Sequence, residues 1–412
     1  MTAASVSTSE PRLSADGSST KPRVLITGAY GFVGAHSVKT ALDQGFRVRG
    51  TVRGFSLADT LKKAVAVGDR HQSEDLELVK IDLSDSDQEA WNKAAQGCTF
   101  CLHLATPVIT EYVADEDTVL RPAVEGTGKV LRACASAGVQ RVVFCSSTSA
   151  INAGHPKEKT AFSTKDWSGE TREADADLQK RTINSTVGQG KEAQAGGERI
   201  FLYEKSKVLA EKTAWKLAHE LGLELCVILP SSIWGPNLLP RVSPCGEAVR
   251  KIVNHEVPIL PRLCFNCVDV RDVAELHVLA LKAPAAKNGR FLADAGIAGS
   301  LDMEQVAQIC DKAMRPFGWS PVTRIGPYWI FYLSALFLHQ AAFILPNVER
   351  GYSYDAKETR EVLKWTKWRS IPKAIEEAAL SMQDQKLFDE SCKSFLGKLA
   401  TMLHCPSRSP CR

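Results

Sequence analysis

The chain of 412 residues is long enough for one large α/β domain or for two smaller domains. Hydrophobic residues make up 44% and charged residues 24% of it, which is ordinary for a soluble globular protein. A formal net charge of only +4 gives no reason to expect a nucleic-acid partner. The 12 cysteines are scattered, and residues 1–21 carry acids and lack the apolar core of a targeting signal. We therefore expect a disordered tail over 1–21 and a reducing, cytoplasmic location.

A strand, a glycine turn and a helix follow this tail. Val24 to Ile26 form an apolar run typical of a buried strand, and apolar residues recur at helical spacing over 32–42. Glycines at every third position let a pyrophosphate contact the backbone at a helix N-terminus. We therefore predict a dinucleotide-binding loop, the alternative being an ordinary glycine-rich βα turn. The contacts are expected from Gly28, Tyr30, Gly31, Phe32, Val33 and Gly34.

The end of the second strand, over 46–52, predicts which dinucleotide binds. An acid there would hold the ribose 2′-hydroxyl of NAD, whereas a basic residue suits the 2′-phosphate of NADP. No acid stands between Gln44 and Gly54, and Arg53 does. We therefore expect NADP(H) to be favoured over NAD(H), unless Arg53 is only a solvated strand end.

Apolar runs then alternate with helical segments. The predicted strands are 76–81, 98–105 and 141–145, and the predicted helices are 57–67, 88–95 and 117–137. This alternation predicts an α/β fold with a Rossmann-like, doubly wound parallel sheet. Asp82 ends the third strand and would face the ligand crevice, where it could bind the adenine amino group; the alternative is capping of the next helix.

The rhythm breaks over residues 155–198, which are polar and glycine-rich, and we expect a long surface excursion there. A helix and a sixth strand at 223–229 complete a cofactor-binding domain over 22–235. A smaller C-terminal substrate-binding portion is predicted over 236–390 and a tail over 391–412. The elements expected in the portion 236–390 are short strands near 265–270 and 290–293 and helices at 272–282 and 302–314.

Residues 328–345 are uncharged and mostly apolar, at the lower limit of what can cross a bilayer. Tyr328 and Trp329 at one end suit a membrane interface. We expect a buried or surface-docked helix. The alternative is a peripheral or single-helix contact with a membrane such as the endoplasmic reticulum.

Tyr203 and Lys207 are four residues apart in a predicted helix, so they share one face. A neighbouring ammonium stabilises a phenolate, which allows a tyrosine to exchange protons near neutral pH. Ser147, at the carboxyl end of the fifth strand, would face the same crevice and hold a substrate oxygen. The Tyr-xxx-Lys spacing is weak evidence alone, but its place between the fifth and sixth strands predicts a catalytic set. His103, at another strand end, is expected to be structural.

These motifs carry a resemblance over about residues 22 to 385 to the extended short-chain dehydrogenase/reductase superfamily. The matching pieces are Thr27-Gly-x-x-Gly-x-x-Gly34, Asp82-Leu83, His103-Leu-Ala-Thr-Pro107, Val124-Glu-Gly-Thr127, Ser147 with Tyr203 and Lys207, and Pro230-Ser-Ser-Ile-x-Gly-Pro236. Three segments are similar to the branch of dihydroflavonol reductases and cinnamoyl-CoA reductases: Gly50-Thr-Val-Arg53, the segment from His103 to Pro107, and Asp269-Val-Arg-Asp-Val273. Members of that branch are NADPH-dependent carbonyl reductases.

The resemblance implies roles for single residues. Ser147, Tyr203 and Lys207 would be catalytic, and Arg53 would bind the 2′-phosphate. Further cofactor contacts would come from Asp82, Leu83, Leu104, Ala105, Thr106, Pro230 and Ile233, besides Tyr203 and Lys207.

Two features depart from this branch. The interval between Ser147 and Tyr203 is longer than usual, and residues 325–332 and 352–357 are similar instead to the 3β-hydroxysteroid and sterol dehydrogenase branch. We expect an NADPH-dependent oxidoreductase acting on a carbonyl or CH–OH group of a small organic substrate. The alternatives are a 3β-hydroxysteroid dehydrogenase-like enzyme and a nucleotide-sugar epimerase. The Cys-x-x-Cys pairs starting at Cys98 and Cys264 are far apart in sequence, so we expect no metal site.

Overall fold

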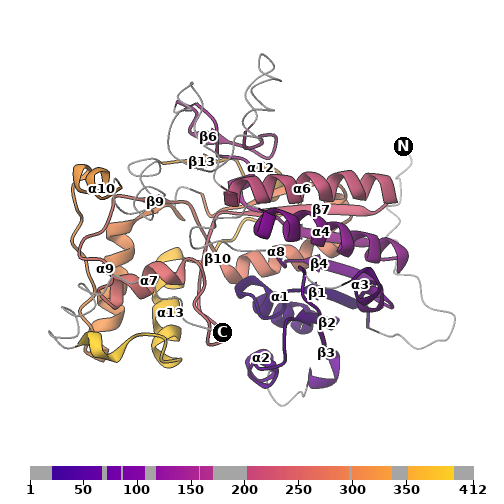
Figure 1. The fold of residues 1–412 in the computed structure, drawn as a ribbon, viewed down its shortest axis with the longest axis horizontal. Coiled ribbons are helices and arrows are strands. Elements are labelled where there is room, and N and C mark those ends of the chain that lie inside the picture. Colours follow the sequence, from indigo (N-terminus) through magenta and orange to yellow (C-terminus); the bar gives the residue numbers. More distant parts are fainter. Residues whose placement is uncertain are drawn as a thin grey trace, which may run out of the picture.

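The computed structural model describes residues 21–393 except 67–71, 85–86, 107–116, 157, 170–201, 297–298 and 336–350. A seven-stranded sheet runs through this described part, and every neighbouring pair of its strands is parallel. The strands are β1 (Arg23–Thr27), β2 (Arg47–Val52), β3 (Leu76–Lys80), β4 (Phe100–His103), β5 (Arg141–Cys145), β7 (Glu224–Pro230) and β11 (Arg290–Ala293). Their order is β11-β7-β5-β4-β1-β2-β3, as Figure 1 shows, which confirms the predicted Rossmann-like α/β fold. The order reverses between β1 and β4, where doubly wound sheets bind their ligands.

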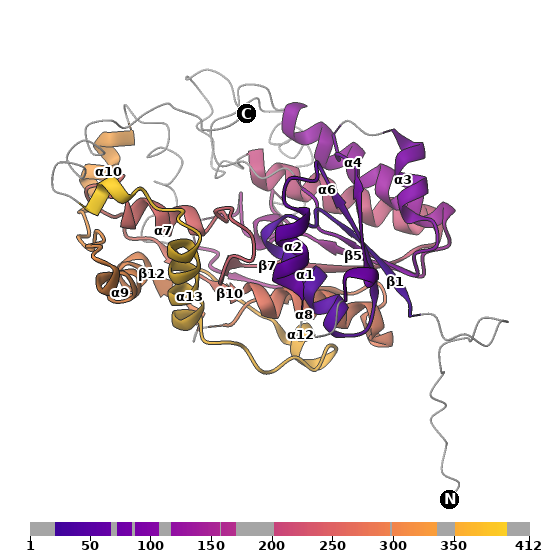
Figure 2. The same cartoon turned by 90° about the horizontal axis from the view of Figure 1, so that it is seen from below.

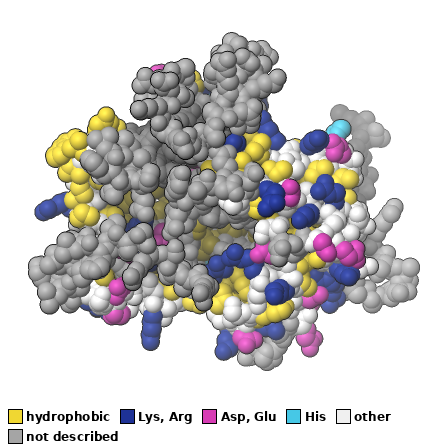
Figure 3. Space-filling view, in the orientation of Figure 1, with side chains coloured by type: hydrophobic (Ala, Val, Ile, Leu, Met, Phe, Trp, Pro, Cys, Tyr) yellow, Lys and Arg dark blue, Asp and Glu magenta, His cyan; other side chains and the backbone are white. Residues whose placement is uncertain are grey.

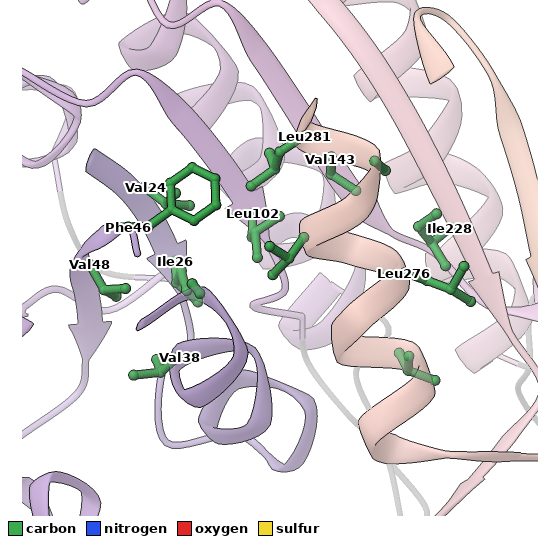
Figure 4. Packing of buried hydrophobic residues seen from close by; sticks show 14 of the residues in the cluster. Val24, Ile26, Val38, Phe46, Val48, Leu102, Val143, Ile228, Leu276 and Leu281 are labelled. Carbon is green, nitrogen blue, oxygen red and sulfur yellow. The ribbon is translucent and has the colours of Figure 1, made fainter. Parts of the chain in front are cut away.

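Helices cover both faces of the sheet (Figures 1 and 2). The helices α1 (Phe32–Asp43), α2 (Ala58–Val65) and α8 (Val270–Lys282) pack together on one side, and α3 (Gln88–Ala95), α4 (Asp117–Ser136) and α6 (Leu202–Leu221) on the other. Alternate residues of β1 enter the two cores. Val24 and Ile26 join the first hydrophobic cluster (Figure 4), whereas Leu25 joins the second. This two-residue alternation is what a strand buried on both faces requires.

One predicted element lies elsewhere than expected. The sequence pattern predicts that the short run at 290–293 belongs to the C-terminal portion, but it forms β11, which pairs with β7 at the edge of the main sheet. The helix before it, α8, packs against α1 on the main sheet. A strand of four residues is too short for its sequence pattern to indicate its partner, so only the tertiary structure assigns it to the sheet.

A third hydrophobic cluster is built around Trp234 and Trp319. It is formed mainly by α7 (Gly246–Val253), α9 (Met303–Met314) and α13 (Ile371–Asp384), which lie to the left in Figure 1. Three short strand pairs complete the described fold: β8 (Ser232–Trp234) with β10 (Cys267–Asp269), β9 (Cys264–Phe265) with β12 (Leu301–Asp302), and β6 (Ala161–Phe162) with β13 (Ser353–Tyr354). A short helix, α12 (Lys357–Glu361), follows β13.

The start of the predicted apolar helix is present as α10 (Tyr328–Ala335). Its large side chains face solvent: Tyr328, Trp329, Tyr332 and Leu333 are between 43% and 61% exposed. Figure 3 shows a hydrophobic surface at the upper left, where Figure 1 draws α10 in the same orientation. Within the described residues, none of the helices has the length and apolar character needed to cross a membrane. Residues 336–345 lie outside the described residues, as do 1–20, 170–198 and 394–412.

Candidate active site

The glycine loop between β1 and α1 requires glycine for steric reasons. Gly28 has a φ of +72°, and a Cβ there would lie 3.2 Å from Cα of Ala105. A Cβ on Gly34 would lie 2.1 Å from the carbonyl oxygen of Gly28, so any side chain would push α1 away from the strand end. The helix α1 begins without a capping side chain and without an acid in its first turn. Its first N–H groups and its positive dipole end therefore suit an anion such as a pyrophosphate.

The other predicted residues of this loop are partly buried: Tyr30, Phe32 and Val33. The Tyr30 hydroxyl is buried and has no hydrogen-bond partner among the described residues. Burial, together with the nearby charge of Asp59, raises the pKa of Tyr30. An unpaired buried hydroxyl of this kind is available to a ligand that enters the loop.

Thr27 ties the glycine loop to the end of β4. Its Oγ1 accepts hydrogen bonds from the backbone N–H groups of Leu104 and Ala105, each at 2.9 Å. Both lone pairs are then used, so the hydroxyl must donate its hydrogen to Nδ1 of His103, 2.9 Å away. The strand end and the segment 104–106 are thereby held beside the glycines.

His103 is consequently a neutral, structural residue. Because its Nδ1 accepts, its Nε2 carries the hydrogen and donates to Oγ1 of Thr127 at 3.2 Å. Thr127 in turn donates to the carbonyl of Ala123. Burial, assisted by the charge of Lys207, lowers the pKa of His103 to about 3. Both ring nitrogens are used within the protein, as expected for a structural histidine.

Arg53 and Asp82 lie at the ends of the adjacent strands β2 and β3. Arg53 is exposed and directly follows β2. Asp82 accepts hydrogen bonds from the backbone and the hydroxyl of Ser84, at 2.9 and 2.7 Å. Burial alone would raise the pKa of Asp82, but these bonds and the charge of Arg53 outweigh it and lower that pKa.

In the structure Asp82 does not cap the next helix, α3, which is the alternative role predicted for it. The N-cap of α3 is Asp87, whose side chain accepts from the backbone N–H of Ala90. Leu83 packs against α4, where a Cβ on Gly126 would lie 2.4 Å from its Cγ. The N-cap of α3 is therefore Asp87 and not Asp82.

The predicted catalytic residues lie just after β5 and on α6. Ser147 directly precedes the 3-10 turn η2 (Thr148–Ala150), and its Oγ accepts from the backbone N–H of Ser149 at 3.1 Å. Its own hydrogen remains available for donation. The helix α6 packs against this turn.

Lys207 lies one turn after Tyr203 on α6 and is buried, with its Nζ 5.8 Å from the centre of the Tyr203 ring. Its charge lowers the pKa of His103 and opposes the rise, caused by burial, in the pKa of Cys145. These two neighbours end β4 and β5. The ammonium is therefore close to the carboxyl ends of β4 and β5, on one side of the switch point.

Pro230 and Ile233 are at the end of β7 and the start of β8. Pro230 pairs with Ala293 of β11, and the next residue, Ser231, donates its N–H to the carbonyl of Ala293 at 3.0 Å. Ile233 is partly buried and pairs with Val268 in β10. These residues follow the same carboxyl edge as Ser147.

Two features of the site were not predicted from sequence. Glu204, beside Tyr203, is largely buried, its Oε2 has no partner among the described residues, and burial raises its pKa to about 7. Tyr354 of β13 returns from the C-terminal part, where its hydroxyl accepts from Nδ2 of Asn152 at 2.8 Å and is hydrogen-bonded to Thr148. The acid in Tyr203-Glu-Lys-Ser-Lys207 could have indicated the first; no sequence signal indicates the second.

Among the described residues, the Cys-x-x-Cys pairs are not part of a metal-binding cluster. Cys98 and Cys101 are buried in the second core, and burial raises the pKa of Cys98 to about 11. Hydrogen bonding to Cys134, followed by burial, raises the pKa of Cys101. Across the described ranges, no group of three or more His, Cys, Asp or Glu side chains is arranged to hold a metal ion.

The sheet topology and the glycine loop at its switch point define a Rossmann-like, dinucleotide-binding class of protein. The sequence model of the NAD dependent epimerase/dehydratase family matches residues 24–173. Cinnamoyl-CoA reductase 1 of Arabidopsis thaliana is 34% identical over 270 residues, covering 65% of this chain and 69% of that protein. Dihydroflavonol 4-reductase of Dianthus caryophyllus is 30% identical over 285 residues, covering 69% of this chain and 72% of that protein.

Solved structures share the fold. The yeast methylglyoxal/isovaleraldehyde reductase Gre2, complexed with NADPH, superposes with a TM-score of 0.67 at 22% identity, covering 88% of this chain and 99% of that chain. Vestitone reductase from alfalfa (Medicago sativa) gives a TM-score of 0.64 at 22% identity, covering 89% and 99%. The chain therefore belongs to the extended short-chain dehydrogenase/reductase family, close to the dihydroflavonol reductase and cinnamoyl-CoA reductase branch. The relatives named here from that branch are reductases.

Proposed function

We propose that the chain is an NADPH-dependent reductase of the carbonyl group of a small organic molecule, or catalyses the reverse oxidation. The observation that carries the proposal is the buried ammonium of Lys207, close to the carboxyl ends of β4 and β5 and one helical turn from Tyr203. The glycine loop follows β1 and Ser147 follows β5, so both lie at the carboxyl edge of the same sheet. The reductase activities named for the relatives support the same reaction class.

NADPH, when bound, supplies the hydride. Tyr203 would donate a proton to the developing alkoxide, and Ser147 would donate a hydrogen bond to the same oxygen. Lys207 would stabilise the tyrosinate that remains and bind the ribose beside it. His103 is neutral and bonded to Thr27 and Thr127, so it would not supply a positive charge beside Tyr203. In this proposal that charge comes from Lys207.

We assign the remaining predicted residues by their place on the sheet edge. The glycine loop would hold the pyrophosphate and Arg53 the 2′-phosphate, while Asp82 and Leu83 would contact the adenine. The segment 104–106, with Pro230 and Ile233, would line the nicotinamide half. In this proposal residues 22–235 bind the cofactor and residues 236–390 contribute most of the substrate pocket.

The decisive experiment replaces Tyr203 by Phe. Loss of the proton donor should reduce turnover by about 10³-fold, within the usual range for general acid catalysis. The dissociation constant for NADPH, measured by calorimetry, should change by less than about twofold, which is under 0.5 kcal/mol. Tyr332→Phe, on the exposed face of α10, is the matched control. Undiminished turnover by the Tyr203 variant would refute the assignment.

The cofactor preference tests Arg53. The unaltered protein should bind NADPH at least about tenfold more tightly than NADH, a difference of 1.4 kcal/mol, and Arg53→Ala should remove most of it. Arg47→Ala, at the opposite end of the same strand, should leave the preference intact. Equal binding of both cofactors by the unaltered protein would contradict the NADP assignment.

A substrate screen separates this proposal from its alternatives. Dihydroflavonols, cinnamoyl-type thioesters, aliphatic aldehydes and 3-ketosteroids would be offered with NADPH. Turnover of steroids alone would favour the 3β-hydroxysteroid branch, and NAD retained through purification would favour an epimerase. Cytoplasmic location and membrane contact through 328–345 stay predictions, and carbonate extraction of cell membranes tests them.

A further inference from the structure

A buried ion pair lies behind the proposed catalytic residues. Tyr203, Lys207 and Glu211 recur at every fourth position of α6 and therefore lie along one side of the helix. Glu211 is completely buried, and both of its oxygens bind Arg290 of β11, at 2.6 Å through Nε and 3.2 Å through Nη2. A two-point pair of this kind fixes orientation as well as distance.

The same carboxylate also holds the end of β5. The hydroxyl of Ser146 donates to Oε2 of Glu211 at 2.5 Å, and Nε1 of Trp215 donates to Oε1 at 3.2 Å. Ser146 is the residue directly before Ser147, and its backbone N–H is bonded to Ile228 of β7. Glu211 thus connects the helix of Tyr203 and Lys207 to the strand end that carries Ser147.

Arg290 extends the connection to a third segment. Its Nη1 donates to the carbonyls of Thr164 and Asp166, both at 2.7 Å, and its guanidinium lies 3.9 Å from the centre of the Trp167 ring. The segment 163–169 is in turn bonded to the turn after Ser147, because Ser168 donates to the carbonyl of Ser149 and accepts from the N–H of Ala153. The contacts form a closed ring around η2.

We propose that Glu211 and Arg290 are positioning residues, which set Ser147 against Tyr203 and Lys207. Buried ion pairs add little net stability, because desolvation offsets their attraction, but their fixed geometry can select one arrangement of the elements they join. Here those elements are α6, β5 and β11, each of which reaches the proposed site from a different part of the chain. The inference rests on the proposed function of Ser147 and Tyr203.

The test compares two ion pairs on the same sheet, the buried pair of Glu211 with Arg290 and the partly exposed pair of Glu224 with Arg141. Glu211→Gln removes the charge and turns one acceptor into a donor, while Ser146→Ala deletes only the hydroxyl and leaves the ion pair with Arg290. The control is Glu224→Gln, which breaks the pair with Arg141 at the other end of β5. Each variant is assayed with NADPH and either isovaleraldehyde or dihydroquercetin as the carbonyl probe, well below its melting temperature.

We expect Glu211→Gln to lower kcat by about 30-fold and Ser146→Ala by about fivefold, with NADPH affinity within twofold of the unaltered protein. Ser146→Thr, which restores the hydroxyl, should recover most of kcat. Glu224→Gln should reduce the melting temperature while kcat stays within twofold. Equal kcat for Glu211→Gln and Glu224→Gln would reduce the ion pair to a structural role and overturn the proposal.

Hydrogen exchange supplies a readout independent of turnover. Amides of residues 145–152 should exchange about tenfold faster in Glu211→Gln and Ser146→Ala, but not in Glu224→Gln. Unchanged exchange in the two test variants would also overturn the proposal. If Tyr203→Phe retained activity while this exchange accelerated as expected, the proposed function would fail and the structural part of the inference would stand.

Discussion

The amino edge and the carboxyl edge of the main sheet differ in what their polar side chains bind. At the amino edge, arginines of the strands donate hydrogen bonds to the carbonyl groups at the C-terminal ends of helices. Arg141 donates to Glu224 and to the last carbonyls around α8, those of Ala280 and Ala283. Arg49 similarly donates to carbonyls at the end of α3. These bonds satisfy groups that a helix end leaves unpaired.

At the carboxyl edge, several polar groups have no partner of this kind. The N-terminus of α1 has no capping side chain. Lys207 is buried, yet no acidic side chain among the described residues forms an ion pair with it. Glu204 retains an unpaired carboxyl oxygen within the described part of the chain. Since unpaired buried groups cost stability, their presence beside the glycine loop and Tyr203 indicates that the carboxyl edge is shaped to receive a ligand.

The largest expected effect on NADPH binding comes from filling the glycine loop. Gly34→Ala places a methyl group 2.1 Å from the carbonyl oxygen of Gly28, so strand and helix must separate. Displacing the loop should weaken NADPH binding at least about 100-fold, close to 3 kcal/mol. Titration of cofactor fluorescence measures it. Gly351→Ala, whose added Cβ meets no atom within 4 Å, is the control. NADPH binding by Gly34→Ala at normal affinity would remove the steric argument.

One variant at each edge tests the comparison directly, and the expected effect on NADPH binding is intermediate. Thr27→Val at the carboxyl edge leaves two amides and a histidine nitrogen without their partner, which should cost about 3 kcal/mol of stability and weaken NADPH binding about tenfold. Arg141→Met at the amino edge should cost a similar 3 kcal/mol and leave NADPH affinity unchanged. Urea unfolding and calorimetry check both variants. A comparable loss of NADPH affinity in Arg141→Met would contradict the division between the edges.

The smallest effect concerns the pH dependence of stability. The pKa of Glu204 in the folded protein is about 7, above its ordinary value of 4.5. Between these values the folded state binds a proton that the unfolded state has lost, so Glu204 makes the protein less stable as pH rises from about 4.5 to 7. Glu204→Gln removes this penalty and should be more stable than the unaltered protein by about 2 kcal/mol at pH 8.

Urea unfolding at pH 5 and pH 8 measures that difference, which should be small at pH 5. Glu220→Gln, exposed on the same helix, should show no such pH dependence. A stability difference for Glu204→Gln that is equal at both pH values would show that the carboxyl group is not desolvated in the folded state.

Local patterns were sufficient for most of the fold. The strands β1 to β5 and β7 were predicted because each is an apolar run between helical segments of matching spacing. The helix carrying Tyr203 and Lys207 was also predicted, and so was the glycine loop. Each of these features depends on residues within about one strand or two helical turns of one another, so their sequence carries the signal.

Longer-range features were not available from such patterns. Arg290 and Glu211 are 79 positions apart, and Asn152 and Tyr354 are 202 apart. No local periodicity connects residues at these separations. The seventh strand, the ring around η2 and the return of β13 to the proposed site all depend on such pairs.

The sequence by itself determined the fold class, the cofactor-binding loop and the residues proposed for proton transfer, because local turns and periodicities specify them. Only the tertiary structure decided that β11 joins the main sheet, that His103 is neutral and that Glu211 and Arg290 lie behind the proposed catalytic residues. The physical reason is that burial and partnership of a charge depend on distant segments. Their packing alone determines which polar groups are satisfied and which stay available to a ligand.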